Sequence, residues 1–366
     1  MAISKGCRRG GSRTVSTLKL HVLSCGHGDT LLLQMPKKKW ALIDCHLPGI
    51  SARERFFQYA NSLGIKTLDY VVLTHPDSDH YQGMRQILEY FSSNGRELGF
   101  FCTAGSSPSH VTKLLESRGV LDADVKEYAA LIRTVIRLHA GSLLKRHALH
   151  DQTATIRISG SKGFSIVAVG PEYNRLAVAE DAALAEISNA SLSVNECSIV
   201  LVVQLVSAFV SRRMFLPGDM EGDGLSKALT RWDTHPDNVD RSRDFDVVKA
   251  PHHGSINGHD VALADRIARK NKSVLVISCG TSYNLPSKSV ISDYLDRGWQ
   301  VYCTSPRQSA TRPKNALQVT QGGNRLRQPT VTTETYDLKV SAGKFTGLAV
   351  TPTAAGIERA DLNAYQ

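Results

Sequence analysis

The first part of the chain alternates short apolar runs with polar turns, a pattern typical of a sheet with helical connections. Residues 18–23, 30–35 and 40–44 alternate or are continuously apolar, and we expect strands there. Residues 70–74 form a β-branched run that stops before Pro76, whose ring cannot continue a strand ladder. This run is therefore predicted to be a short buried strand, with the next residues on a turn outside the sheet.

Between and after these runs, apolar residues recur at the spacing of helices, as in residues 52–63, where Gly64 follows as the expected helix end. Further predicted strands are 100–103, 154–158, 164–170, 195–203, a run from 214, 246–249, 273–278, 300–304, 333–340 and 346–350. Further predicted helices are 83–91, 111–118, 122–146, 222–232, 261–269 and 288–297, with a helix or loop at 174–190. Alternation of strands and helices in two halves favours an α/β fold with four layers, αββα.

The two ends of the chain differ in composition from its middle. Residues 1–16 are rich in Gly, Ser and Arg and are predicted to be a flexible basic tail. Residues 17–305 carry the alternating pattern and are expected to form one domain, with a helical insertion at about 109–150. Residues 306–366 are rich in Thr, Gly and Pro, and we expect a C-terminal extension of unknown role.

Charge favours a polyanionic partner. The 366-residue chain has a net charge of +10, and its first 40 residues hold many basic side chains but only one acid, Asp29. A second basic region spans residues 297–327. A solvated basic surface that only aids solubility is the alternative. The hypothesis is a nucleic-acid partner, with DNA favoured.

Cysteine usage and the apolar runs predict a soluble protein in a reducing compartment, the cytoplasm. Seven cysteines occur without a Cys-x-x-Cys pair, and the N-terminus lacks the apolar segment of a secretory signal. The longest apolar run, 199–210, is interrupted by Gln204 and is too short to span a bilayer. No membrane partner is expected.

Four potential metal ligands follow the strand at 70–74 within six residues: His75, Asp77, Asp79 and His80. Imidazole and carboxylate together suit Zn, Mn or Fe and are unlike a thiolate site. A polar loop that happens to be acidic is the alternative. We favour a metal site, because so many close acidic groups would repel or titrate without a cation.

The sequence His-x-Asp-x-Asp-His at 75–80 resembles the second motif of the metallo-β-lactamase superfamily, with Asp77 where the superfamily usually has His. Residues 214–219 resemble the strand of this family that ends in Gly-Asp, and Pro-His-His-Gly-Ser at 251–255 closely resembles another of its motifs. The resemblance implies the four-layer αββα metallo-β-lactamase sandwich.

The turn Gly-His-Gly-Asp at 26–29 narrows the resemblance to one branch. It is similar to the Gly-Gln-Gly-Asp opening of the metallo-hydrolase domain of bacterial competence DNA-uptake channels, with His27 in place of Gln. The motifs cover about residues 17–305 in the order of that family. Those channels are membrane proteins and this chain lacks their membrane part, so we expect a free-standing relative.

The resemblance also implies a ligand set for two divalent ions, Zn or Mn. It assigns His75 and Asp77 to the first metal, Asp79 and His80 to the second, Asp219 to both, and either His252 or His253 to the second. The segment that matches the third motif offers Asn195, Glu196 and Ser198 in place of a His. The first metal is therefore under-ligated, and we expect it to be weakly held or its site to be empty.

Divalent ions lower the pKa of water and stabilise developing negative charge, which predicts hydrolytic chemistry. Asp79 and His253 are the candidate catalytic residues, and His27 and His259 are further candidates for a general acid. The candidate substrate-binding residues are His27, Asp29, Asn195, Ser255 and His259. Simpler alternatives exist, because His259 could be a surface residue and His27 could only pack against its turn.

The predicted function is a metal-dependent phosphodiesterase, foremost a nuclease that hydrolyses DNA. A soluble relative of this branch could be the effector of a bacterial antiviral defence system with a protein partner that activates it. Two alternatives stay open: a hydrolase of small esters or cyclic nucleotides, and a catalytically degenerate binding or regulatory module. The degenerate module is favoured by residues 280–287, which stand where the uptake channels usually have a His-rich loop.

Overall fold

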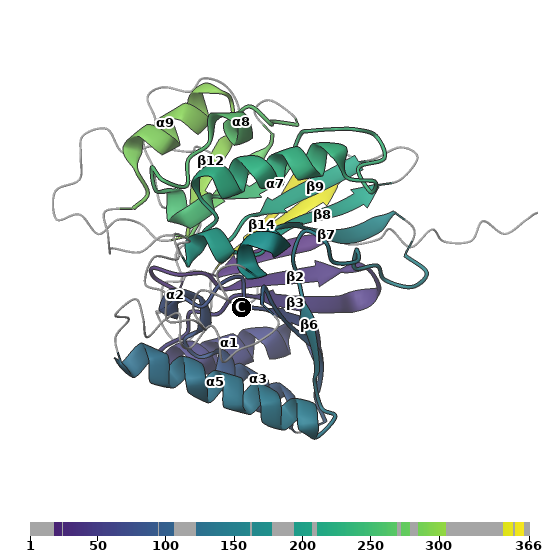
Figure 1. The fold of residues 1–366 in the computed structure, drawn as a ribbon, viewed down its shortest axis with the longest axis vertical. Helices are drawn as coiled ribbons and strands as arrows, with labels where there is room; N and C mark the ends of the chain where they lie inside the picture. The colour runs from purple at the N-terminus through teal and green to yellow at the C-terminus, as the bar shows by residue number, and fades with distance from the viewer. Residues whose placement is uncertain are drawn as a thin grey trace, which may run out of the picture.

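The structure is a computed structural model of the whole chain. It describes residues 18–23, 25–93, 95–105, 122–161, 163–177, 194–206, 211–268, 272–278, 285–304, 347–353 and 356–361. Two sheets lie at the centre of the molecule, and helices cover their outer faces (Figure 1).

The first sheet has eight strands in the order β14-β13-β1-β2-β3-β4-β5-β6. They are β1 (Lys19–Leu23), β2 (Leu31–Met35), β3 (Lys39–Ile43), β4 (Thr67–Val72), β5 (Glu97–Thr103), β6 (Lys145–Ala148), β13 (Gly347–Thr353) and β14 (Gly356–Asp361). Neighbours from β14 to β3 are antiparallel, and neighbours from β3 to β6 are parallel.

The second sheet has six strands in the order β12-β11-β10-β9-β8-β7. They are β7 (Phe164–Gly170), β8 (Val200–Val206), β9 (Ser211–Leu216), β10 (Val247–Lys249), β11 (Val274–Ile277) and β12 (Gln300–Cys303). Neighbours from β9 to β12 are parallel, whereas β7, β8 and β9 are antiparallel.

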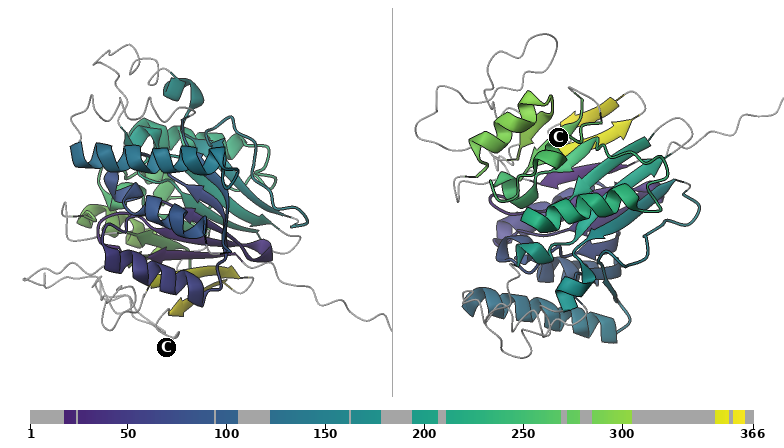
Figure 2. Two further views of the ribbon diagram at one scale, coloured as in Figure 1. Left: turned by 90° about the horizontal axis from the view of Figure 1, so that it is seen from below. Right: turned by 45° about the horizontal axis from the view of Figure 1, so that its top comes forward.

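Three hydrophobic clusters define the four layers. One buries the facing sides of the two sheets against each other, with side chains such as Leu33, Ile43, Leu216 and Val276. The other two bury the outer face of each sheet under helices. The first sheet is covered by α1 (Ile50–Ser62), α3 (Met84–Phe91) and α5 (Asp122–Ala140), the second by α7 (Gly222–Thr234), α8 (Val261–Ala264) and α9 (Lys288–Asp296) (Figures 1 and 2). The expected αββα architecture is confirmed.

The parallel strands explain where polar residues gather. Carboxyl ends of parallel strands meet at one edge of a sheet, and ligand sites of α/β proteins lie there. Asp44 follows β3, residues 75–80 follow β4, Asp219 follows β9 and residues 251–255 follow β10. Because the sheets are packed face to face, the edges of both contribute to one site.

Several predicted boundaries are wrong. The helix expected at 122–146 ends at Ala140, because Gly141 and Ser142 interrupt it and Leu143 N–H bonds back to Leu138 O. Residues 145–148 form β6 instead and pair with β5. The helix expected at 261–269 ends at Ala264.

Of the strand expected at 154–158, only Ile156 pairs, as an isolated bridge to Ile166. The predicted helix at 111–118 and the predicted strand at 333–340 lie outside the described residues. So does most of the helix or loop expected at 174–190.

Part of the predicted C-terminal extension joins the first sheet. β13 pairs antiparallel with β1, and β14 pairs with β13, so a hairpin extends the edge of the sheet (Figure 2). The pairing links residues near the two ends of the chain.

The described part of the chain contains no helix long and apolar enough to cross a membrane.

Candidate metal centre

A short helix after β4 carries two of the predicted ligands. Residues after β4 enter α2 (Ser78–Tyr81), and Asp77 caps it by accepting a hydrogen bond from Ser78 N–H. The cap determines where α2 begins. It therefore helps to place Asp79 and His80 beside the ends of β3 and β9.

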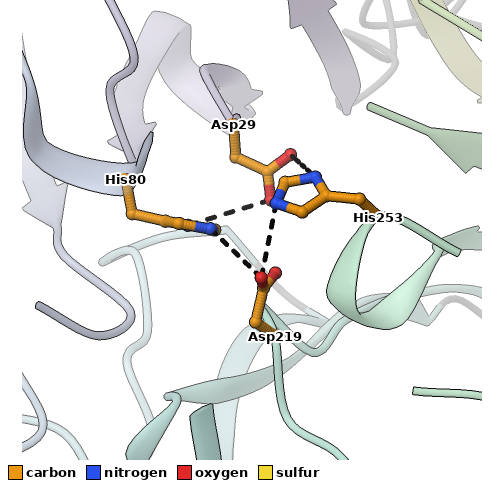
Figure 3. A group of neighbouring side chains, drawn as sticks. All are labelled: Asp29, His80, Asp219 and His253. Carbon is orange, nitrogen blue, oxygen red and sulfur yellow. Dashed lines mark ion pairs between the residues drawn. The ribbon is translucent and has the colours of Figure 1, made fainter. Parts of the chain in front are cut away.

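Four buried side chains, which we call the inner group, converge between the sheet edges: Asp29, His80, Asp219 and His253 (Figure 3). Asp219 Oδ2 lies 3.4 Å from His80 Nε2 and 3.3 Å from His253 Nε2. Asp29 carboxylate oxygens lie 4.0 Å from Nδ1 of His80 and of His253. One donor atom from each of the four residues lies within 4.8 Å of the others.

Asp44 holds the ring of His80 in place. Its Oδ2 lies 2.9 Å from His80 Nδ1 and accepts a hydrogen bond from Thr74 Oγ1, and its Oδ1 accepts one from Thr74 N–H. Such a carboxylate fixes the proton on Nδ1 and leaves Nε2 for a metal. Although burial disfavours the charged ring, Asp219 and other nearby carboxylates raise the pKa of His80 in the metal-free protein.

The structure separates the two histidines that the sequence could not tell apart. His253 Nδ1 donates to Ser278 O at 3.0 Å, which leaves Nε2 facing the inner group. His252 Nδ1 instead lies 3.0 Å from Glu221 Oε2, and its Nε2 lies 3.5 Å from Asn195 Nδ2. Both histidines have left-handed backbone angles, with φ of 43° and 51°, which point their rings in different directions.

A second candidate set, which we call the outer group, contains His27, Asp79 and His253. Asp79 Oδ2 lies 3.5 Å from His27 Nε2 and 3.2 Å from His253 Nε2. The side chain of Asp79 is 21% exposed, so this group is the more open one. Burial and the nearby His253 lower the pKa of His27 to about 4, and its imidazole is therefore neutral at pH 7.

Lys249 is a buried cation within the site. Its Nζ lies 2.5 Å from Asp29 Oδ2 and 3.5 Å from Asp219 Oδ1. Burial disfavours the charged ammonium, but Asp29 and Asp219 outweigh this effect and raise the pKa of Lys249. The lysine therefore stays charged and balances part of the negative charge of the two carboxylates.

The donor atoms of this centre suit a divalent cation. Nε2 of His75, His80 and His253 is buried, and within the described chain none makes a hydrogen bond of good geometry. Buried polar atoms are rarely left in that state, because it costs about 1–3 kcal/mol each. Neutral imidazole nitrogens next to carboxylate oxygens are ligands for Zn or Mn. The two groups therefore fit the cation that the sequence predicted.

The residues assigned to the first metal are less well gathered. His75 is buried, and burial together with His80 lowers its pKa to about 3, so its ring is neutral. The rings of His75 and His80 lie 4.1 Å apart, and His75 Nδ1 lies 3.0 Å from Thr74 Oγ1. Neither His75 nor Asp77 belongs to the two candidate groups found among the described residues.

Two predicted substrate-binding residues have other contacts. Ser255 Oγ accepts a hydrogen bond from Gly258 N–H and so stabilises the turn after residues 251–254. His259 Nε2 lies 3.1 Å from Asp293 Oδ2 on α9, and its ring contacts Tyr294. His259 thus packs against α9, and within the described chain it belongs to neither metal group.

Sequence reasoning missed the roles of Asp44 and Lys249, and it assigned Asp29 only to substrate binding. Their positions in the sequence could have indicated these roles. Asp44 ends an apolar strand, and Lys249 lies two residues before the histidine motif at 251–255. Charged residues are almost never fully buried unless they are paired. A charged residue within a strand that is predicted to be buried could therefore have indicated a nearby residue of opposite charge.

Gly28 is expected to be essential for the geometry of the site. A Cβ at this position would lie 2.5 Å from Asp79 O and 2.6 Å from the ring of His46, and φ is +125°. Gly28→Ala should therefore displace the 26–29 turn from α2, lowering the free energy of unfolding by roughly 2 kcal/mol or more. Thermal unfolding and metal titration would measure the effect.

Gly26→Ala is the matched control for this prediction. Gly26 also has a positive φ, +89°, but a Cβ there would have no neighbour within 4 Å. Only backbone strain of about 1 kcal/mol is expected, with metal binding retained. Equal effects of the two substitutions would show that contact with Asp79 is unimportant.

One comparison of the sequence with protein families supports the fold. Residues 23–94 match the sequence profile described as Metallo-beta-lactamase superfamily. No curated protein matches the chain. The metallo-beta-lactamase fold protein YhfI from Bacillus subtilis is similar in structure, with 14% identity, a TM-score of 0.43, and coverage of 78% of this chain and 96% of that one.

Two further solved structures are similar over most of this chain. The long-form RNase Z from yeast has 11% identity and a TM-score of 0.40, with coverage of 75% of this chain and 38% of that one. A diphosphatase from the PhnP family has 13% identity and a TM-score of 0.38, with coverage of 75% and 90%.

Proposed function

We propose that this protein is a metal-dependent hydrolase that acts on phosphodiester bonds. The observation that carries the proposal is the convergence of buried imidazoles and carboxylates whose metal-facing nitrogens make no good hydrogen bond. A site of this kind is costly to fold unless a cation satisfies it. The fold and the match to the metallo-β-lactamase profile at 23–94 support a hydrolase in general.

The residues have distinct roles in the proposed reaction. His80, Asp219 and His253 would hold a divalent cation, which when bound lowers the pKa of water and stabilises charge on the reacting phosphoryl group. Asp79 is partly exposed beside them, so its carboxylate can accept a proton from the attacking water. Asp44 keeps the ring of His80 oriented through Nδ1.

DNA is the proposed substrate. The net charge of +10 favours a polyanion, and the motif resemblance to the metallo-hydrolase domain of competence DNA-uptake channels points to DNA. The same resemblance supports a cytoplasmic effector of a bacterial defence system that a protein partner activates. These narrower assignments rest on the sequence.

The test is cleavage of linear, circular and single-stranded DNA by the full chain with Mn, Mg or Zn, beside Asp79→Ala and His80→Ala. We expect metal-dependent cutting that both variants abolish, while His259→Gln retains it, because His259 pairs with Asp293 and belongs to neither metal group among the described residues. Bound metal without DNA cleavage would favour a small ester or cyclic-nucleotide substrate, to be assayed directly. Neither binding nor cleavage would favour a degenerate binding module and would overturn the enzyme proposal.

A further inference from the structure

His27 lies where a metal ligand would lie. Its Nε2 is 3.5 Å from Asp79 Oδ2, and its ring centroid is 4.5 Å from that of His253. The side chain is 15% exposed, so it lies at the open side of the site, and a cation bound beside Asp79 could reach its Nε2. In the motif that this turn resembles, the same position is usually Gln, a much weaker metal ligand.

The spacing around Asp79 and His253 matches one coordination sphere. Ligands bound at about 2.0–2.2 Å in tetrahedral to octahedral geometry lie roughly 3.0–3.5 Å from one another. Three contacts have this length: His27 to Asp79 at 3.5 Å, Asp79 to His253 at 3.2 Å, and His253 to Asp219 at 3.3 Å. Each of these contacts brings a ring nitrogen to face a carboxylate oxygen, as ligands of one cation would lie.

The inner and outer groups cannot bind two independent ions with all their ligands. Both include His253, whose Nδ1 is engaged with Ser278 O, so Nε2 is its only donor atom for a metal. One nitrogen lone pair binds one cation. The two groups therefore fit a single cation better, with His253 Nε2 as the ligand that they share.

The backbone holds His27 firmly against this sphere. Asp29 N–H donates to Asp79 O at 3.1 Å, and Gly28 lies directly against the same carbonyl group. The turn of His27 and the helix of Asp79 are thus joined by main-chain contacts. Little rearrangement is needed for His27 to coordinate, and such preorganisation favours tight binding.

We propose that His27, on the side of Asp79, is a further direct ligand of the cation that His80, Asp219 and His253 would hold. It supplies an imidazole on the outer side of the site, beside Asp79 and His253. This inference rests on the proposed metal-dependent function.

Metal affinity of the full chain would test the proposal. Wild type and His27→Gln would be stripped with a chelator and titrated with Co(II) against a competing indicator dye, with the Co(II) absorption spectrum recorded. We expect His27→Gln to bind at least about tenfold more weakly, because even loss of a group behind a ligand costs ten- to a hundredfold. The visible bands of Co(II) should also shift as a nitrogen ligand is lost.

His259→Gln is the matched control, since this histidine pairs with Asp293 and should leave affinity and spectrum unchanged. Unfolding of the metal-free proteins would show that His27→Gln is folded, and His27→Asn would replace it if it is not. Wild-type affinity and spectrum in the folded variant would overturn the ligand role and leave the proposed function intact. No Co(II) binding by wild type would overturn both.

Discussion

Asp219→Asn is expected to lose tight metal binding and all metal-dependent hydrolysis. One carboxylate oxygen contacts both His80 Nε2 and His253 Nε2, and the other faces Lys249 Nζ. Asparagine keeps the shape but removes the negative charge on which all three contacts depend. The expected loss of metal affinity exceeds about a hundredfold, the upper range for a residue that only supports a ligand.

Isothermal titration with Zn or Mn, together with the DNA cleavage assay, would measure this loss. Asp237→Asn is a suitable control, because Asp237 is a partly buried aspartate that pairs with Arg157 and belongs to neither metal group among the described residues. It should lose some stability and no metal affinity. If Asp219→Asn bound metal as tightly as wild type, the inner group could not be the cation site.

Lys249→Met is expected to destabilise the metal-free protein by about 3–5 kcal/mol, the usual cost of removing one partner of a buried ion pair. Methionine has a similar length, so the loss is mainly electrostatic. Without Nζ, the carboxylates of Asp29 and Asp219 would be buried with less compensating charge. Chemical denaturation in the presence of a chelator would measure the free energy of unfolding.

Added divalent cation should stabilise Lys249→Met more than it stabilises wild type, because its charge replaces the lost ammonium. Lys227→Met provides the comparison, since Lys227 is 44% exposed and pairs with Asp223 and Glu172 on the surface. Its removal should cost less than about 1 kcal/mol. A similarly small cost for Lys249→Met would show that the buried pair contributes little.

Opposite charges from both sheets meet in the site. Asp29 enters from the turn after β1, Asp219 from the end of β9 and Lys249 from the end of β10. Each is buried, and a buried charge requires a partner of opposite sign or a metal. Metal binding and folding should therefore be coupled in this protein.

The fold class could be predicted from the sequence alone, and so could the segments that carry the candidate metal ligands. Strands and helices follow from the local period of apolar residues, so β1, β2, β3, α1 and α3 lie close to where they were expected. The residues at 75–80 were recognisable because four potential ligands follow one strand closely. Signals of this kind are local and need no knowledge of distant contacts.

The predicted boundaries of helices and strands are wrong where strand pairing between distant residues determines the structure. Residues 145–148 continue the helical pattern of α5 but pair with β5, since the sheet offers them hydrogen bonds that a frayed helix end does not. The pairing of β13 with β1 joins residues more than 300 positions apart, and nothing local indicates it.

Only the tertiary structure decided which atoms meet in the site. His252 and His253 are adjacent and identical in type, but the structure turns the ring of His253 to Asp219 and that of His252 to Glu221. Asp44 and Lys249 carry no motif, and their roles arise from contacts with residues 30 to 220 positions away. Asp44 meets His80 at the ends of two strands of one sheet, whereas Lys249 meets Asp29 across the two sheets. Both contacts depend on the tertiary structure, because burial makes each charge require a partner.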